Sequence, residues 1–320
     1  MIWTLASIDY NNPNFHVTVI DDCSKEKWKK AEQLFPTVTF LYSQNNMGPG
    51  MARQLGIEYT NEPYLMFIDT DDYVINPEMF DEIIQTINNH PEVDMFSWKH
   101  ITDKSKEIQP EAHNRMHGRI YKREFLNKYG LHFYEDSSRA NEDVGFNRLC
   151  RLIFKQLERK GEPNHMLVIE KPLIVWTQDP TSITNKNGGE FIYKAQNLGL
   201  AKSEIHVVEN AKRLGIDRDL IEVEVNEIMS TEYYFFLITC QERDEFMQEA
   251  WNGAKLFYNT VFKDYETKDF NTFNLSFAIW IKIIRKRMIQ RHWRKHISVN
   301  ARRFLQELIK FDSPPEYYKG

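Results

Sequence analysis

The first half of the chain alternates short apolar runs with stretches of helical spacing. The apolar runs are 16–20 (HVTVI), 38–42 (VTFLY), 64–68 (YLMFI) and 95–98 (MFSW), and each is continuously hydrophobic, as strands buried on both faces are. Helices are predicted between them at 25–34, 49–59 and 77–88, and the last two open with a proline in the first turn. This alternation predicts an α/β fold with a doubly wound, mostly parallel sheet.

The second half has fewer strand-like runs and a long helical pattern. Residues 166–169 and 173–176 are predicted as two further strands around a turn at Lys171 and Pro172. After Gly189, apolar residues recur at helical spacing almost to the end of the chain. The sequence NKNGG at 185–189 is typical of a linker.

Length and composition are those of a globular protein with one main domain and an appendage. The chain has 320 residues, of which 42% are hydrophobic and 13% aromatic, enough for a sizeable core. We expect an α/β domain over 1–188 and a mostly helical domain over 189–320. Three scattered cysteines suit neither a disulfide framework nor a zinc cluster, and no signal peptide or membrane span is indicated. A cytoplasmic location is therefore expected.

The net charge of −5 hides a basic segment near the end of the chain. Residues 282–303 contain nine lysines and arginines and no acid. Most charge runs are solvated faces, but the apolar residues interleaved here at helical spacing also suit a helix lying on a phosphate-rich surface. That surface would be either a membrane or a nucleic acid.

Acidic residues cluster at the ends of two predicted strands. Asp21 and Asp22 follow the first, in VTVIDDCS, and Asp69, Asp71 and Asp72 follow the third, in LMFIDTDD. Ligands of open α/β sheets bind outside the carboxyl ends of the strands, so both clusters are expected at one site. Crowded carboxylates are tolerated around a divalent cation, and their oxygens suit Mg²⁺ or Mn²⁺ and the phosphates that such ions bridge. The alternative is that these acids only cap the following helices.

Two further stretches carry candidate chemistry. In NNMGPGMARQLGI at 45–57, two glycines allow close backbone approach, and Arg53 could face a phosphate or an aspartate. The stretch is neither a phosphate-binding loop of the Walker type nor a dinucleotide fingerprint. In SSRANEDVGFN, Glu142 and Asp143 precede a helical run, and either is a candidate general base. Acids favoured at the start of a helix are the alternative explanation of that pair.

Taken in order, five motifs resemble the family 2 glycosyltransferases of the GT-A fold. They are VTVIDDCS, NNMGPGMARQLGI, YLMFIDTDDY, HGRIYKREFLNKYGLHF and NEDVGFN, and the resemblance covers roughly residues 2–185. It implies an inverting transfer of a sugar from a nucleoside-diphosphate sugar, with UDP as the expected carrier, assisted by Mg²⁺ or Mn²⁺. The acceptor would be a hydroxyl on a saccharide, a lipid-linked molecule or a modified DNA base. The last two acceptors would suit an enzyme at a membrane surface or one of viral origin.

The resemblance also implies a role for each matching residue. On the donor side, Asp22 would read the base beside Asp21, Asp69 would contact the ribose, and Asp71, with Asp69, would hold the metal ion on the diphosphate. Arg53 matches an arginine of the family, although Gln54 follows it in place of asparagine.

The acceptor side takes its residues from the later motifs. Asp143, beside Glu142, would be the catalytic base, although Asn141 stands where the family usually has threonine. His117 matches a histidine–glycine pair and would approach the acceptor or the diphosphate. A lone histidine is more often structural, so both roles of His117 stay open.

One departure from the family pattern affects the expected function. Such chains begin with a central strand, whereas residues 3–8 here resemble the end of the helix that follows that strand. A missing central strand would leave backbone groups unpaired and would remove part of the nucleotide pocket. A catalytically silent descendant that acts as an interaction module therefore stays open beside the glycosyltransferase. A metal-dependent nucleotidyltransferase, which would share the strand-end aspartates, is a third alternative.

Overall fold

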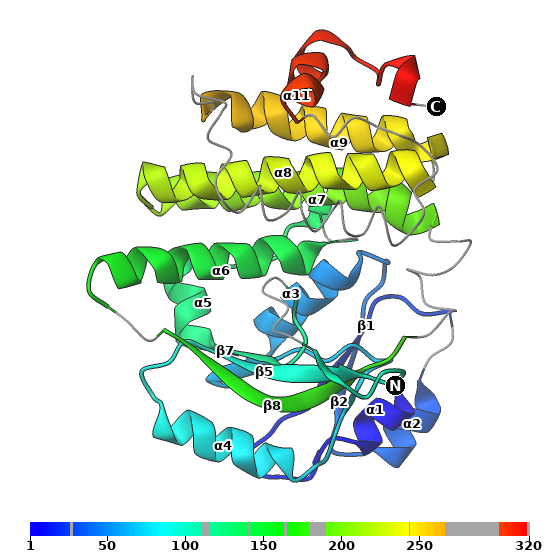
Figure 1. The fold of residues 1–320 in the computed structure, drawn as a ribbon. Helices are drawn as coiled ribbons and strands as arrows, with labels where there is room; N and C mark the ends of the chain where they lie inside the picture. The colour runs from blue at the N-terminus through cyan, green and yellow to red at the C-terminus, as the bar shows by residue number, and fades with distance from the viewer. Residues whose placement is uncertain are drawn as a thin grey trace. The chain divides into compact units, whose positions relative to one another are not determined.

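The computed structural model describes the chain except residues 26–27, 110–114, 138, 140, 163–164, 179–189, 243, 266–300 and 319–320 (Figure 1). The chain divides into two compact units, Met1–Ser182 and Ile183–Gly320. The predicted domain boundary after residue 188 lies outside the described residues, and so does most of the basic segment 282–303.

Two sheets form the centre of the first unit. In the smaller sheet, β1 (Thr18–Asp21) pairs in parallel with β2 (Thr39–Tyr42). The larger sheet has the strand order β3, β7, β5, β8, β4, with β6 (Ile108–Gln109) paired to β5. Its other strands are β3 (Tyr64–Met66), β4 (Tyr73–Val74), β5 (Met95–Thr102), β7 (Arg119–Lys122) and β8 (Met166–Trp176). The α/β class is confirmed, with mixed pairing: β5 and β8 are parallel, whereas β7 and β4 run antiparallel to their neighbours.

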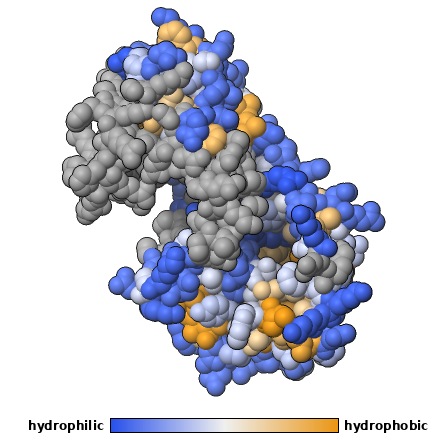
Figure 2. All heavy atoms as spheres, turned by 90° about the vertical axis from the view of Figure 1, so that its right-hand side faces the viewer, coloured by the Kyte–Doolittle hydropathy of each residue, from blue (hydrophilic) through white to orange (hydrophobic). Residues whose placement is uncertain are grey.

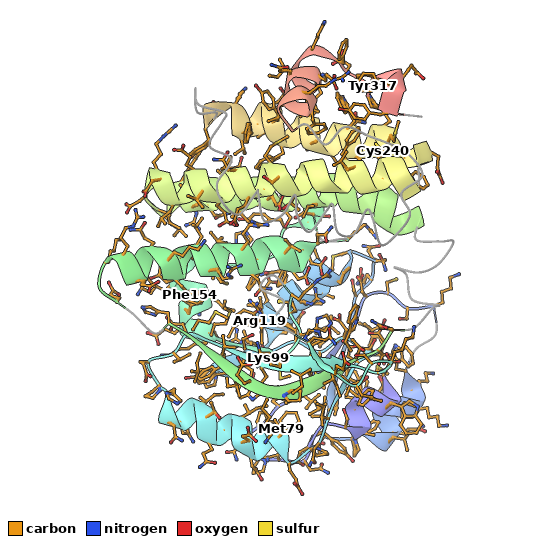
Figure 3. The ribbon with its side chains drawn as sticks, in the orientation of Figure 1. Met79, Lys99, Arg119, Phe154, Cys240 and Tyr317 are labelled. Carbon is orange, nitrogen blue, oxygen red and sulfur yellow. The ribbon has the colours of Figure 1, made fainter. Side chains whose placement is uncertain are left out.

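Helices cover both faces of the larger sheet. α3 (Pro49–Tyr59), α5 (Arg123–Tyr129) and α6 (Glu142–Arg159) lie on one face, and α4 (Met79–Asn89) lies on the other (Figure 1). Two short helices, α1 (Ile2–Ala6) and α2 (Lys29–Leu34), precede β1 and β2. Met79 of α4, labelled in Figure 3, belongs to the core cluster that also contains Phe96 and Trp98 of β5. The visible surface in Figure 2 is mostly hydrophilic, with small separate hydrophobic patches.

The start of the chain agrees with the sequence expectation for residues 3–8. α1 opens the chain, and within the described ranges β1 pairs only with β2, while β3 pairs only with β7. The two sheets therefore stay separate, and one long edge of β1 and one of β3 have no strand partner among the described residues. Side chains that lead into β1, such as Val17, nevertheless pack on the same core cluster as Tyr64 and Met66 of β3.

The prediction of two strands around Lys171 and Pro172 is wrong. The structure has one long strand, β8, which pairs in parallel with β5 along its length. Pro172 has no N–H to donate to the ladder, and a proline inside a sheet is accommodated at a bulge. The register between β5 and β8 shifts at Lys99, which is paired with Pro172, and this irregularity lets the strand continue.

The second unit is helical, as predicted for the chain after residue 189. Its described helices are α7 (Glu190–Arg213), α8 (Arg218–Glu242), α9 (Met247–Thr260) and α11 (Ala301–Lys310). Phe236 of α8 packs against Trp251 of α9 and Phe304 of α11, with ring centroids 5.3 and 5.2 Å away. Cys240, labelled in Figure 3, is buried and is not part of a disulfide bond. Within the described residues, no helix combines the length and apolarity needed to cross a bilayer.

Two glutamates share the interior of the helical unit. Glu204 on α7 is 0% exposed and Glu232 on α8 is 1% exposed, and the two carboxyl groups interact electrostatically. Burial raises the pKa of Glu232 well above its usual range, and the adjacent Glu204 raises it further. Two carboxylates buried side by side repel each other unless one of them takes a proton. The helical unit is therefore most stable while the pair keeps that proton.

We expect Glu232→Gln to stabilise the protein more at pH 8 than at pH 5. The folded-state pKa of Glu232 lies above the unfolded value of about 4.3, so its stabilising effect is complete at acid pH and is lost as pH rises between the two values. Glutamine carries no charge to desolvate, and each pKa unit corresponds to about 1.4 kcal/mol. Urea unfolding at both pH values measures the effect, and the exposed Glu227→Gln on the same helix is the control. An equal effect of Glu232→Gln at both pH values would contradict the raised pKa of Glu232 in the folded protein.

Candidate functional site

Three aspartates lie in the short connection from β3 to β4. The Asp72 N–H donates to the Asp69 carbonyl at 2.9 Å, which closes a tight turn. The Asp72 side chain is 2% exposed, whereas the Asp69 side chain is 48% exposed and Asp71 is also exposed. Burial raises the pKa of Asp71, and the charges of Asp72 and Asp69 raise it further. The carboxylates therefore do repel one another, and a cation among them would relieve that repulsion.

Arg53 on α3 joins this turn to the start of α6. Its guanidinium donates to Asp69 Oδ1 at 2.8 Å and to Glu142 Oε1. The Arg53 side chain is only 11% exposed; burial lowers its pKa, but the neighbouring acids Asp69, Glu142 and Asp143 raise it by more. Burial raises the pKa of Asp69, but the charges of Arg53 and His117 lower it by more, so the net shift of this pKa is downward. Arg53 is thus a permanent cation among three segments distant in sequence.

Glu142 and Asp143 occupy the first turn of α6. Asn141 precedes them as the N-cap residue in a left-handed conformation, φ 58° and ψ 23°, which asparagine adopts more readily than threonine. The Glu142 side chain is 8% exposed, and burial followed by the Asp143 charge raises the pKa of Glu142 to about 7 against the opposing effect of Arg53. Asp143 is 9% exposed, and its backbone carbonyl accepts a hydrogen bond from Asn147 Nδ2 at 2.9 Å.

The first acidic cluster closes the end of β1 against the loop before α3. Asp22 accepts hydrogen bonds from the N–H groups of Met47 and Gly48, both at 2.7 Å. Gly48, with φ 91°, is the N-cap residue of α3, the helix that carries Arg53. Asp21 is 4% exposed; its Oδ1 accepts from the Ser24 N–H at 2.9 Å, and its buried Oδ2 has no hydrogen-bond partner among the described residues. The contacts of Asp22 order the glycine loop, and its role toward a base stays a prediction.

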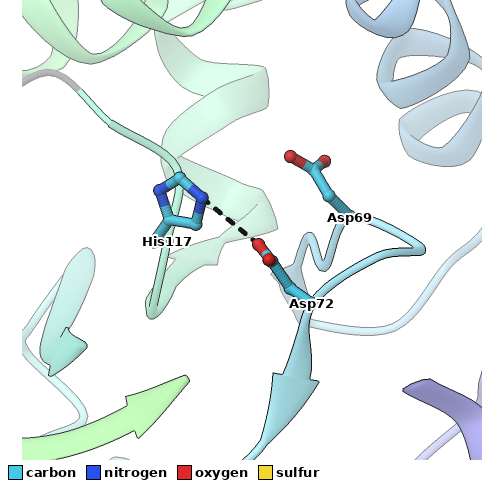
Figure 4. A group of neighbouring side chains, drawn as sticks. All are labelled: Asp69, Asp72 and His117. Atoms are coloured by element: carbon cyan, nitrogen blue, oxygen red, sulfur yellow. Dashed lines mark ion pairs between the residues drawn. The ribbon is translucent and has the colours of Figure 1, made fainter. Parts of the chain in front are cut away.

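His117 stands at the opposite side of the aspartate turn. Its Nε2 lies 3.3 Å from Asp72 Oδ2, and Figure 4 shows the imidazole facing that carboxylate. The next residue, Gly118, has φ +69°, and its carbonyl accepts a hydrogen bond from the Trp98 N–H at 2.9 Å. A Cβ at residue 118 would lie 2.7 Å from the Trp98 carbonyl oxygen. Glycine is thus required to hold the chain close to β5 and to aim His117 at the turn.

Gly118→Ala is expected to lower the free energy of unfolding by about 2–4 kcal/mol, because a left-handed alanine costs about 1–2 kcal/mol and the backbone clash adds to it. Gly161→Ala is the matched control, since Gly161 also has a positive φ, +84°, but nothing lies within 4 Å of its added Cβ. Urea unfolding of the two variants isolates the contribution of the contact. Equal losses would show that the contact with Trp98 is unimportant.

Within the described part of the chain, one group of side chains has the spacing of metal ligands. The ligand atoms of Asp69, Asp72 and His117 lie within 4.8 Å of one another (Figure 4). Two carboxylates and an imidazole are a donor set that suits Mn²⁺, and the carboxylates alone suit Mg²⁺. Of the two ligands expected from the sequence, Asp69 belongs to this group, whereas Asp71 is adjacent to it but is not part of it, so its role as a ligand stays a prediction.

Several neighbours of the site were not identified from the sequence. Asp72 was assigned no role, although it accepts a hydrogen bond from the Thr177 N–H at 2.8 Å. Arg139, just before α6, donates to the side chain and carbonyl of Asn46 in the glycine loop, both at 2.7 Å. Trp176, the last residue of β8, lies beside His117 with ring centroids 5.7 Å apart. Of these residues, only Trp176 could have been noticed from the sequence, as a tryptophan at the end of a predicted strand.

Comparisons with known proteins identify relatives of this chain. The family model described as "Glycosyl transferase family 2" matches residues 2–152. An "Uncharacterized glycosyltransferase" of Haemophilus influenzae is 31% identical over 80 residues, which are 25% of this chain and 27% of that protein. The poly(ribitol-phosphate) beta-N-acetylglucosaminyltransferase TarS of Staphylococcus aureus is 23% identical over 159 residues. That match takes in 44% of this chain and 28% of TarS, so the chain spans little more than a quarter of these relatives.

The fold also has a solved counterpart. The crystal structure of S. aureus TarS 1-349 in complex with UDP superposes with a TM-score of 0.58 at 17% sequence identity. The alignment covers 82% of this chain and 76% of that chain. This likeness confirms the predicted GT-A fold.

Proposed function

Because residues 2–152 belong to glycosyl transferase family 2, we propose that the chain transfers a sugar from a nucleoside-diphosphate sugar, with UDP as the carrier, to a hydroxyl acceptor by an inverting displacement. The observation that carries this proposal is the pair of contacts of Arg53. Through Asp69 on one side and Glu142 on the other, Arg53 brings the aspartate turn and the acids of α6 to one site. Donor-side and acceptor-side residues would then face one bound donor, as a single displacement requires.

The aspartate turn is the proposed position of the donor diphosphate. Asp69, Asp72 and His117, with Asp71 next to them, would hold Mn²⁺ or Mg²⁺. When bound, such an ion offsets the negative charge that develops on a departing diphosphate. Support for UDP as the carrier comes from TarS, which was crystallised with UDP. Asp21 and Asp22 would border the base, because they lie at the end of β1 beside the glycine loop.

The first turn of α6 is the proposed position of the base. Asp143 would take the proton of the attacking hydroxyl, and one base is sufficient for an inverting displacement. Glu142 is engaged by Arg53 and is therefore better placed to fix the geometry of the turn than to accept that proton. His117 would approach the diphosphate or the acceptor from the side of Asp72.

A catalytically silent interaction module is the second candidate function. It is favoured by the separation of β1 from β3, because a nucleotide pocket that spans these strands would lie on an interrupted sheet. The sequence expectation of a metal-dependent nucleotidyltransferase rests only on the strand-end aspartates, which all three functions share.

Thermal unfolding with nucleotides separates these functions. A ligand that binds only the folded state at about a hundred times its Kd adds about 2.7 kcal/mol, which shifts Tm by several degrees. We expect UDP with Mn²⁺ to stabilise the protein and Asp71→Ala to remove the effect. A shift that survives Asp71→Ala would assign the metal to Asp69, Asp72 and His117 without Asp71. No shift with any nucleoside diphosphate, and no hydrolysis across a panel of nucleotide sugars, would favour the silent module.

A further inference from the structure

Trp176 is an exposed aromatic ring that directly follows the buried stretch of β8. Leu173, Ile174 and Val175 of β8 are at most 4% exposed, and Trp176, which follows them, is 40% exposed. Other tryptophans are also exposed, among them Trp3 and Trp28, so exposure alone decides nothing. Trp176 differs from them in its position. It is the last residue of β8, and β8 pairs with β4, which begins at Tyr73, one residue after Asp72.

The backbone around Trp176 is fixed on both sides. The Trp176 carbonyl accepts a hydrogen bond from the Asp103 N–H at 3.1 Å, and the N–H of the next residue, Thr177, donates to Asp72 Oδ1 at 2.8 Å. The carboxylate that belongs to the candidate metal group therefore also positions the residue after the tryptophan. A ring held in this way loses little conformational freedom when a ligand binds to it.

Two imidazoles pack beside the indole of Trp176. His117 and His100 lie 5.7 and 6.4 Å from the Trp176 ring and are stacked on each other at 5.5 Å. Burial, followed by the charges of His117 and Arg115, lowers the pKa of His100 to about 4, so this imidazole is neutral at physiological pH. The two imidazoles therefore fix the orientation of the indole and leave part of its surface open to solvent.

We propose that the exposed surface of Trp176 is a platform for the sugar ring of the acceptor, an inference that rests on the proposed glycosyltransferase function. One face of a pyranose presents C–H groups that pack on an aromatic ring, while its hydroxyl groups reach outward to polar partners. Trp176 supplies the aromatic surface, and the aspartate turn, the proposed position of the donor diphosphate, lies beside it next to His117.

The strand order places this platform on the acceptor side. β3, which leads to Asp69 and its partner Arg53, is at one end of the larger sheet, whereas β8 and β4 are at the other. The residues expected to lie near the nucleotide include Asp22, which follows β1, and Arg53, which is on α3. A donor bound there has the aspartate turn between its base and Trp176. A ring stacked on Trp176 is therefore that of the acceptor and not the nucleobase.

The test follows the indole N–H signals of ¹⁵N-labelled protein by NMR, with UDP and Mg²⁺ present. Trp176→Phe assigns the Trp176 signal, and Trp28→Phe assigns a control signal from another exposed tryptophan. Methyl β-D-glucopyranoside and methyl N-acetyl-β-D-glucosaminide are titrated as probes, and ribitol is titrated as an open-chain polyol without a ring face. We expect the glycosides to shift the Trp176 signal, and ribitol to leave it in place.

Kinetics provide the second arm, with the same glycosides as acceptors. Trp176→Ala is expected to lower kcat/KM for transfer at least about tenfold while hydrolysis of the nucleotide sugar is unchanged, and Trp176→Phe should recover most of the loss. A Trp176 signal that no glycoside moves, or that ribitol moves equally, would overturn the proposal. An equal loss of hydrolysis and transfer in Trp176→Ala would also overturn it, because Trp176 would then act on donor binding or on folding. A wild-type protein without hydrolysis of any nucleotide sugar would instead refute the proposed function, and the NMR result would still report on the platform.

Discussion

Asp143→Asn is expected to lower the rate of sugar transfer by about 10²–10⁴-fold, the usual contribution of a general base. Asparagine keeps the size of the side chain but cannot accept the proton of the attacking hydroxyl at neutral pH. Nucleotide binding should persist, because the residues proposed for the donor belong to β1, α3 and the aspartate turn. Initial rates of transfer, together with the Tm shift produced by UDP and Mn²⁺, measure the two properties separately.

Asp81→Asn is the matched control for this substitution. Asp81 is also an acid in the first turn of a helix, but it is exposed and belongs to α4, on the opposite face of the larger sheet (Figure 1). If Asp143 only interacted with the helix macrodipole, both substitutions would have similar small effects. Glu142→Gln completes the set: a greater loss of transfer than with Asp143→Asn, at equal folded content, would make Glu142 the base.

The order of the elements was predictable because it depends on local patterns. Residues 49–59 form a helix with the predicted bounds, since Pro49 fixes its first turn and apolar positions recur along it. The apolar run at 64–68 contains β3 for a similar reason. β7 was not predicted as a strand, because its four residues, RIYK, become one only by pairing with β3 and β5. Short strands of this kind are determined by their partners rather than by their own pattern.

The composition of the site was predictable to a lesser degree than the fold. The acids at the strand ends and at the start of α6 could be identified, since each lies next to a recognisable element. Their contacts could not, because Arg53 and Glu142 are 89 residues apart and His117 and Asp72 are 45 apart in the chain. The residue pattern alone does not rank Asp71 against Asp72, and only the family resemblance favours Asp71. That choice depends on which carboxylate turns inward, and the structure buries Asp72 beside His117.

The position of Arg53 has a consequence for stability. Its two carboxylate partners differ in exposure: Asp69 is 48% exposed, whereas Glu142 is 8% exposed. Loss of the guanidinium would leave Asp69 in contact with water but Glu142 buried without its counter-charge. An uncompensated buried charge is far more costly than an exposed one, so the effect of losing Arg53 should come mainly through Glu142.

Arg53→Met should therefore lower the free energy of unfolding by about 3 kcal/mol at pH 8, and by less at pH 6. The pKa of Glu142 is already about 7 because of burial and the Asp143 charge, so at pH 6 the Glu142 carboxyl takes a proton and no longer carries a charge that needs Arg53. The double variant Arg53→Met with Glu142→Gln should recover most of the loss at pH 8, because glutamine removes the charge that Arg53 balanced. Urea unfolding of the wild type, both single variants and the double variant at the two pH values completes the cycle. If the double variant is as unstable at pH 8 as Arg53→Met alone, the loss comes from packing of the arginine stem and not from the charge of Glu142.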